Sequence, residues 1–99
     1  MAAFSLTPKT VPQVETKHRR IKTAIPNPAT LPVIEELMKC EPDSMNSELP
    51  VVWDRAKGYQ VFDASGNCWR DFTSTIFVAN VGHSHPKVVK AITEMAGRS

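Results

Sequence analysis

The sequence predicts a small α+β chain, built from an extended N-terminal arm, a short helix, a β-hairpin and a C-terminal helix. Three observations carry this prediction. Five of the eight prolines lie within the first 32 residues, apolar residues recur at helical spacing after residues 30 and 85, and aromatic and β-branched residues gather around a turn between them. With 99 residues, the chain is at most one small domain with a modest core.

Residues 1–30 read as an irregular, Pro-rich arm. Each proline removes a backbone donor and biases the preceding residue toward extended geometry. The arm also holds a basic stretch over residues 17–22, made of Lys17, His18, Arg19, Arg20 and Lys22. Such a stretch is usually a solvated tail, and the alternative is a targeting or interaction element.

The segment "TLPVIEELMKCE" predicts a helix over residues 31–41. Val33, Leu37 and Cys40 recur at the spacing of one helical face, and Ile34 and Met38 widen it. Thr30 is the expected N-cap, Pro32 fits the first turn, and Pro42 ends the helix.

A β-hairpin is predicted next, with strands over residues 59–63 and 68–72 and a turn over residues 64–67. Tyr59, Val61, Phe62, Trp69 and Phe72 are typical strand residues. In the turn, Asp63 is positioned to cap, and Gly66 and Asn67 tolerate positive φ. A two-stranded hairpin is marginal alone in water, so we expect it to pack on another segment.

The segment "HPKVVKAITEMAG" predicts a helix over residues 86–96. Pro86 fits its first turn, Gly97 is a stop signal, and Val88, Val89, Ile92 and Ala96 supply one apolar side.

Just before this helix, "NVGHSHP" reads as a strand-to-helix junction. Gly82 permits a sharp bend, and Ser84 or His85 caps the helix. The alternative is a metal site at His83 and His85, but zinc needs three or four ligands and no further ligand cluster is evident nearby. We therefore expect no metal.

Composition excludes several other functions. A net charge of +2 is too small to indicate nucleic-acid or membrane binding, and no apolar run approaches the roughly 20 residues of a spanning helix. Cys40 and Cys68 match no metal-ligand spacing and read as free thiols in a reducing compartment. These features predict a cytoplasmic protein; organelle transit is the weaker alternative, because Pro8 and Pro12 interrupt any amphipathic leader helix.

Local motifs assign no chemistry. The chain holds no GxSxG, GxxxxGK[ST] or GxGxxG sequence. Asp63 and Asp71 flank the hairpin, but two acids beside a turn are more often turn and strand-end residues than a catalytic pair.

The run from Pro50 to Ile92 resembles the N-terminal segment of class-III pyridoxal-phosphate-dependent aminotransferases. The matching features come in order along "PVVWDRAKGYQVFDASGNCWRDF" and "TSTIFVANVGHSHPKVVKAI". They are Gly58, the turn 63–67, the pair Asp71-Phe72, and the junction from Asn80 to Pro86. The upstream "RRIKTAIPNP" and "ELMKCE" look like the lead-in of enzymes near 4-aminobutyrate aminotransferase.

The resemblance implies a fold and a reaction. Residues 31–99 would be part of the small N-terminal subdomain of a fold-type I pyridoxal-phosphate enzyme, beside a large cofactor domain and at a homodimer interface. The complete enzyme would transfer an amino group from an amine or omega-amino acid to a 2-oxo acid, using pyridoxal 5'-phosphate. The segment after Asp71-Phe72 would line the substrate entrance, which makes Ser74, Thr75, Ile76 and Phe77 the substrate-pocket candidates; the alternative for them is plain core packing.

The family's Schiff-base lysine, pyridine-nitrogen Asp and phosphate loop lie downstream of the matched segment. Lys57, Lys87 and Lys90 do not match that lysine by context, so no catalytic or cofactor-binding residue is assigned. We therefore expect an N-terminal piece that lacks the large domain and is inactive by itself. The alternative is a short non-catalytic protein that docks on a full-length aminotransferase through the dimer-interface surface.

Overall fold

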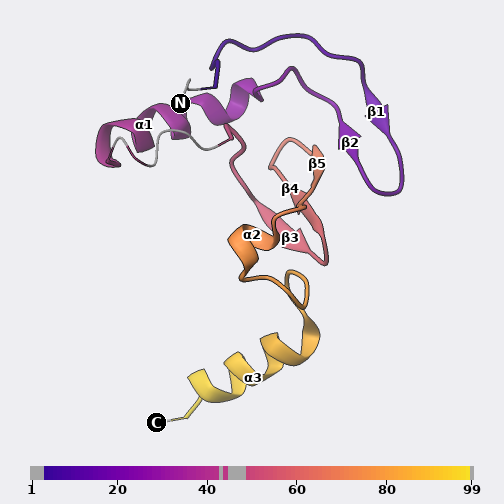
Figure 1. The fold of residues 1–99 in the computed structure, drawn as a ribbon, viewed down its shortest axis with the longest axis vertical. Coiled ribbons are helices and arrows are strands. Elements are labelled where there is room, and N and C mark those ends of the chain that lie inside the picture. The colour runs from indigo at the N-terminus through magenta and orange to yellow at the C-terminus, as the bar shows by residue number, and fades with distance from the viewer. Residues whose placement is uncertain (1–3, 43, 45–48, 99) are drawn as a thin grey trace.

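An antiparallel sheet lies between two well-separated helices in the computed structural model, which describes residues 4–42, 44 and 49–98 (Figure 1). The α+β class predicted from the sequence is confirmed; the assignment to a particular subdomain stays a prediction. In chain order the elements are β1 (Val14–Glu15), β2 (Arg20–Ile21), the 3-10 helix η1 (Pro28–Thr30), α1 (Leu31–Cys40), β3 (Arg55–Lys57), β4 (Gln60–Phe62), β5 (Cys68–Arg70), α2 (Ser74–Phe77) and α3 (Pro86–Ala96).

The sheet has five strands in the order β1-β2-β5-β4-β3. The predicted hairpin is confirmed as β4 and β5, with Val61 opposite Trp69, although each strand is shorter than expected. The third strand, β3, pairs antiparallel with β4 and was not predicted. Its sequence Arg55-Ala56-Lys57 lacks the β-branched and aromatic residues that mark a strand, so its pairing with β4 alone reveals it.

The turn between β4 and β5 forms as its residues predict. Asp63 Oδ1 accepts hydrogen bonds from the amides of Ser65 and Asn67, each at 3.0 Å. Gly66 takes a positive φ of 86°. Asn67 does not have a positive φ. Its side chain is fully buried and contacts the arm instead.

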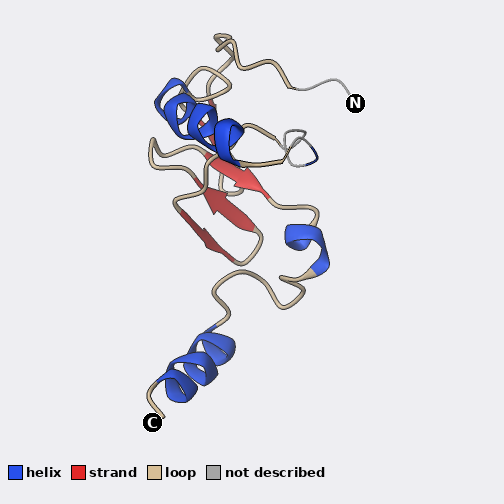
Figure 2. Ribbon diagram, turned by 90° about the vertical axis from the view of Figure 1, so that its left-hand side faces the viewer, coloured by secondary structure: helices blue, strands red, loops and turns tan. Residues whose placement is uncertain are grey.

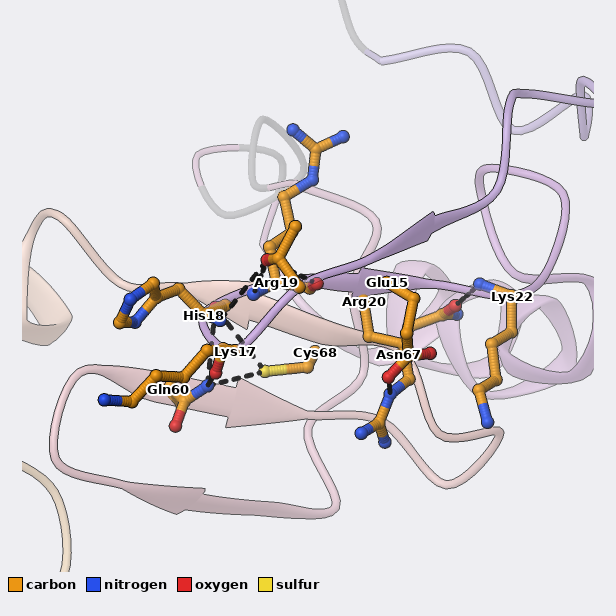
Figure 3. A network of polar contacts seen from close by, with 10 residues as sticks. Glu15, Lys17, His18, Arg19, Arg20, Lys22, Gln60, Asn67 and Cys68 are labelled. Atoms are coloured by element: carbon orange, nitrogen blue, oxygen red, sulfur yellow. Dashed lines mark hydrogen bonds and ion pairs between the residues drawn. The ribbon is translucent and has the colours of Figure 1, made fainter.

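The arm is irregular over most of its length, but it also adds two short strands to the sheet, which the prolines gave no reason to expect. Arg20 in β2 pairs with Cys68 in β5. Polar side chains of the hairpin hold this stretch (Figure 3): Gln60 Nε2 donates to the carbonyl of Lys17 at 3.2 Å, and Asn67 Oδ1 accepts from the amide of Lys22 at 2.7 Å. The basic stretch is therefore attached to the sheet through its backbone.

The core is small and partly polar. Its buried apolar residues are Ile21, Val61 and Cys68, one from each of the three central strands. Beside them, the buried carboxylate of Asp63 accepts from Asn67 Nδ2 at 2.7 Å and from Asn27 Nδ2 at 3.0 Å. Because every partner is hydrogen-bonded, this cluster joins the arm to the hairpin without leaving a buried polar group unpaired.

Helix α1 confirms the predicted element to within one residue, and Thr30 occupies its N-cap position as predicted, but the Thr30 side chain makes no capping bond to the helix. The 3-10 turn η1 runs directly into α1, so Thr30 has helical dihedrals and its hydroxyl donates to the carbonyl of Asn27 at 2.8 Å. The side-chain cap lies at the start of η1, where Asn27 accepts from the amide of Ala29. The apolar residues Val33, Leu37 and Met38 remain exposed.

Helix α3 has the bounds that its sequence predicts, and it extends away from the sheet (Figure 2). His85 is the cap, since its Nδ1 accepts from the amide of Lys87 at 3.3 Å. The apolar side of α3 is exposed, including Val88, Val89, Ile92 and Met95. Among the helices described, none is both long and apolar enough to cross a membrane.

Candidate functional site

The four substrate-pocket candidates Ser74, Thr75, Ile76 and Phe77 form one turn, α2. All four have positive φ, from 50° to 69°, so the turn is left-handed. Left-handed geometry costs roughly 1–2 kcal/mol per residue and is least tolerated by β-branched residues such as Thr75 and Ile76. Ile76 and Phe77 are also 73% and 77% exposed, which does not support the alternative of core packing within the part described.

The carboxylate of Asp71 holds the start of this turn. Its Oδ1 accepts from the amide and the hydroxyl of Thr73, at 2.9 and 3.0 Å. Its Oδ2 accepts from the amide of Thr75 at 3.0 Å and, more weakly, from the Thr75 hydroxyl at 3.4 Å. Asp71 therefore binds the residues on both sides of Ser74.

Asp71 is also paired with His83, whose Nε2 lies 2.7 Å from Asp71 Oδ2. The side chains are only 5% and 12% exposed. An ionised carboxylate only accepts, so His83 Nε2 carries the proton that it donates. Burial raises the pKa of Asp71, but the hydrogen bonds from His83, Thr73 and Thr75 outweigh burial and lower this pKa to about 2.

The junction that contains His83 is hydrogen-bonded to the turn between β3 and β4. Gly58 and His83 exchange two backbone hydrogen bonds of 2.9 and 2.8 Å, and the ring of Trp53 packs edge-on against His83. Gly82 has φ of 89°, and a Cβ there would lie 3.2 Å from the Cα of Gly58. The glycine therefore permits a close approach of two backbones as well as the predicted bend.

A hollow of about 320 Å³ lies between this junction and α2. Ser74 lines it, whereas Thr75, Ile76 and Phe77 do not. Its lining consists of Gly58, Tyr59, Asp71, Ser74, Ala79, Asn80, Val81, Gly82 and His83. The structure thus groups the four candidates in one turn but brings only the first of them to the hollow.

A second, mainly apolar cavity of about 270 Å³ lies between the arm and the hairpin. Lys9, Ile25, Asp63 and Trp69 are among its lining residues. The indole Nε1 of Trp69 is buried and has no hydrogen-bond partner among the residues described.

The three lysines compared with the family's Schiff-base lysine lie at the surface of the part of the chain that is described. Lys57, Lys87 and Lys90 are all exposed, whereas a Schiff-base lysine is activated by a desolvated or cationic environment. Lys90 lies 3.7 Å from Glu94 on the surface of α3. Within the same residues, no three His, Cys, Asp or Glu side chains gather as metal ligands. His83 is paired with Asp71, whereas His85 caps helix α3.

Sequence reasoning missed the Asp71–His83 pair. It interpreted Asp63 and Asp71 as turn and strand-end residues, which their positions confirm, and His83 as part of the junction. The two partners are 12 residues apart, on either side of α2, so no local spacing connects them. The sequence signal that could have indicated a role for Asp71 was its position directly after a strand, with Thr73 and Thr75 following as local hydrogen-bond donors.

Comparison with known proteins gives a consistent result. Residues 43–99 match the family model described as "Aminotransferase class-III". The chain is 48% identical to the ornithine aminotransferase of Saccharomyces cerevisiae over 48 residues, which are 48% of this chain and 11% of that protein.

Longer alignments join the chain to two further relatives. It is 39% identical over 67 residues to a mitochondrial ornithine aminotransferase of Oryza sativa, covering 65% of this chain and 14% of that protein. It is 36% identical over 74 residues to the 4-aminobutyrate aminotransferase of Mycobacterium leprae, covering 75% of this chain and 17% of that protein. The chain thus spans less than a fifth of the length of these relatives.

These matches confirm the resemblance that the ordered motifs between Pro50 and Ile92 indicate. Because the family model covers more than half of the chain, the chain belongs to the class-III aminotransferase family.

Proposed function

We propose that the chain is the N-terminal part of a pyridoxal-phosphate-dependent transaminase that moves an amino group from an amine or omega-amino acid to a 2-oxo acid. The observation that carries the proposal is the family match over residues 43–99. The names of two relatives, 5-aminovalerate aminotransferase and 4-aminobutyrate aminotransferase, support an amino donor with its amino group far from its carboxylate.

In this proposal α2 lines the substrate entrance. Ile76 and Phe77 provide an apolar wall beside the carbon chain of the amino donor, because their side chains are exposed on a turn that is fixed at its base. Apolar walls of this kind orient a ligand, while the reacting atoms are handled elsewhere. Pyridoxal phosphate supplies the electron sink of the reaction when bound, and we assign its binding to parts of the complete enzyme other than the residues described.

The test uses the full-length protein loaded with pyridoxal phosphate. We expect transamination of a 2-oxo acid with at least one member of a panel of amines and omega-amino acids of increasing length. Ile76→Ala is expected to raise the KM for the preferred donor severalfold with little change in kcat, because it removes binding surface and no reacting group. A loaded protein that transaminates no pair in the panel would contradict the proposal.

A docking protein is the second candidate, and the exposed apolar residues of α1 and α3 favour it. In that case the chain would be a finished short protein that binds a full-length aminotransferase through the dimer-interface surface. The two candidates predict different masses for the native protein. The tryptic peptide "GYQVFDASGNCWR" identifies the species whose mass is measured. A species several-fold heavier than 11.0 kDa supports the transaminase, whereas one at that mass that co-elutes with a full-length relative supports docking.

A homodimer for the complete enzyme and a cytoplasmic location are parts of the same proposal. The rice relative is named as mitochondrial, which makes import into mitochondria the alternative location. Cell fractionation followed by detection of the same peptide distinguishes the two compartments.

A further inference from the structure

We propose that Asp71 is a positioning residue, which fixes the left-handed turn α2 and so sets where Ile76 and Phe77 meet the amino donor. The inference rests on the proposed function for the role of the donor, but the fixing of the turn by Asp71 is testable without any activity. Asp71 lies after the end of β5 and before α2, at the boundary between the sheet and the proposed entrance.

The turn needs an external support. Its four residues Ser74 to Phe77 all have positive φ, and two of them are β-branched. Strained backbone of this kind persists only where the surrounding structure determines it, and it is concentrated at functional sites. Internal hydrogen bonds close the turn, from the Phe77 amide to the Thr73 carbonyl and from the Ala79 amide to the Ser74 carbonyl, at 2.9 and 2.8 Å. The first of these bonds joins residues four apart, as in an ordinary right-handed turn, so it does not explain the left-handed choice.

Asp71 supplies the additional constraint. Its two oxygens accept from the amides of Thr73 and Thr75, so they fix the directions of two N–H groups that flank the first residue of the turn. Hydrogen bonds to an ionised group are stronger than those between neutral groups, and burial protects them from competition by water. One carboxylate therefore holds the backbone amides on both sides of Ser74.

Asp71 is itself held by two further contacts. The amide of Asp71 donates to the carbonyl of Tyr59 at 2.8 Å, and His83 holds Oδ2 from the other side. His83 is in turn tied to Gly58 by the backbone bridge. Asp71 thus connects the strands β3, β4 and β5 to the exposed side chains of Ile76 and Phe77, which lie only a few residues further along the chain.

The chain offers a matched control. Asp63 is another buried carboxylate that accepts two backbone amides, those of Ser65 and Asn67, at the opposite end of β5. Asp63→Asn is therefore expected to weaken the hairpin turn without altering α2. Any effect of Asp71→Asn that Asp63→Asn does not share belongs to the position of Asp71, and not to the loss of a buried charge.

The first measurement is hydrogen–deuterium exchange of the full-length protein in solution. In Asp71→Asn, the amides of residues 73–78 are expected to exchange about tenfold faster or more, because a carboxylate oxygen that accepted an amide is replaced by an NH₂ group. Amides of residues 60–69 are expected to keep their rates. Thr73→Val, which removes only the hydroxyl donor, is expected to give a smaller acceleration, and it replaces Asp71→Asn if that variant does not fold.

The second measurement is steady-state kinetics of the pyridoxal-phosphate-loaded protein with a short and a long amino donor. Asp71→Asn is expected to raise the KM for the long donor about tenfold relative to the short donor, with kcat changed less than KM. The absorption spectrum of the bound cofactor is expected to stay the same, since Asp71 touches the turn and not the reacting atoms. Asp63→Asn is expected to keep the ratio of the two KM values.

The outcomes separate this inference from the proposed function. Unchanged exchange over residues 73–78 in both Asp71→Asn and Thr73→Val overturns the inference, whatever the activity. If the amides of residues 73–78 exchange faster in Asp71→Asn but the ratio of the KM values for the long and the short donor is unchanged, the role of Asp71 in donor selection is overturned. A wild-type protein without transaminase activity contradicts the proposed function, while the exchange result still decides whether Asp71 fixes the turn.

Discussion

The carboxylate of Asp71 stays charged in an almost closed environment, because hydrogen bonds from Thr73, Thr75 and His83 replace the water that burial removes. This arrangement has a consequence for acid stability. A carboxyl group whose pKa is lower in the folded chain than in the unfolded chain stabilises the fold only while it is ionised.

We therefore expect Asp71 to contribute stability that is full above about pH 4 and is lost as the pH falls toward 2. The pKa of this group is lowered in the folded chain from 3.8 to about 2. Urea unfolding of the wild-type chain and of Asp71→Asn, followed by tryptophan emission at low temperature, measures the contribution. The difference in unfolding free energy between the two should shrink between these pH values. A difference that is constant from pH 6 to pH 2 would contradict the expectation.

Gly82 and Gly58 differ in what an added side chain would contact. Both have positive φ, but an added Cβ meets the opposite backbone only at Gly82. Gly82→Ala is expected to destabilise the chain by about 1–3 kcal/mol, through backbone strain together with the close contact. Gly58→Ala should cost only about 1 kcal/mol, from left-handed geometry alone. Equal losses for the two variants, measured by urea unfolding, would show that the close approach of the two backbones is unimportant.

Among the larger units, the arm illustrates how a segment without strong propensity of its own becomes structured. Strands β1 and β2 have only two residues each, and β2 is aligned beside β5. The alignment depends on Asn67, which is 0% exposed and whose Oδ1 accepts from the amides of both Lys22 and Thr23.

Asn67→Ala is expected to release the arm, because two backbone amides lose their acceptor at a cost of about 1–3 kcal/mol each. Trypsin cleavage after Arg19, Arg20 and Lys22 should then become several times faster, while cleavage after Lys87 should not change. Asn80→Ala is the control, since Asn80 is exposed and its side chain, among the residues described, donates a single bond, to the carbonyl of Phe77. An arm that stays equally resistant in Asn67→Ala would mean that the β2–β5 pairing suffices by itself.

The entire chain is more open than an ordinary domain of its length. Its radius of gyration is 15.8 Å, whereas a compact domain of this length has about 13 Å. The helices α1 and α3 lie at opposite ends, with the sheet between them (Figure 1), and no residue of either helix is buried. Few of the apolar residues that the structure describes are buried, so little hydrophobic stabilisation offsets the conformational entropy of folding.

The isolated chain is therefore expected to be marginally stable. An 11-residue helix such as α3 is short for independent stability in water, so it should be largely unfolded when nothing covers it. Thermal unfolding followed by circular dichroism should give a broad transition at low temperature and less helix than the structure contains. A sharp transition at high temperature would contradict this prediction and would indicate that the apolar sides of α1 and α3 are covered, for example by self-association.

Local signals predicted most of the elements. The bounds of α3 follow from Pro86, the apolar spacing and Gly97, and the hairpin follows from its aromatic residues and the turn at Gly66. Thr30 occupies the N-cap position of α1 as predicted, but the side-chain capping bond is made by Asn27 at the start of the 3-10 turn that precedes the helix. The strand β3 was missed because its residues have no strand preference without β4 beside them.

The sequence by itself determined the α+β class, the hairpin, both long helices and the family, while the role of Ser74 to Phe77 at a substrate entrance stays a prediction. Each of these depends on residues that are close along the chain or on an ordered motif. Only the tertiary structure decided that the arm joins the sheet, that the candidates form a left-handed turn, and that Asp71 meets His83. The place of the arm and the Asp71–His83 pair depend on contacts between residues 12 to 48 positions apart, whose partners are chosen by how the sheet brings backbones together and not by local propensity. The turn is held by bonds from Asp71 to Thr73 and Thr75, which are close along the chain but whose left-handed geometry no residue preference predicts.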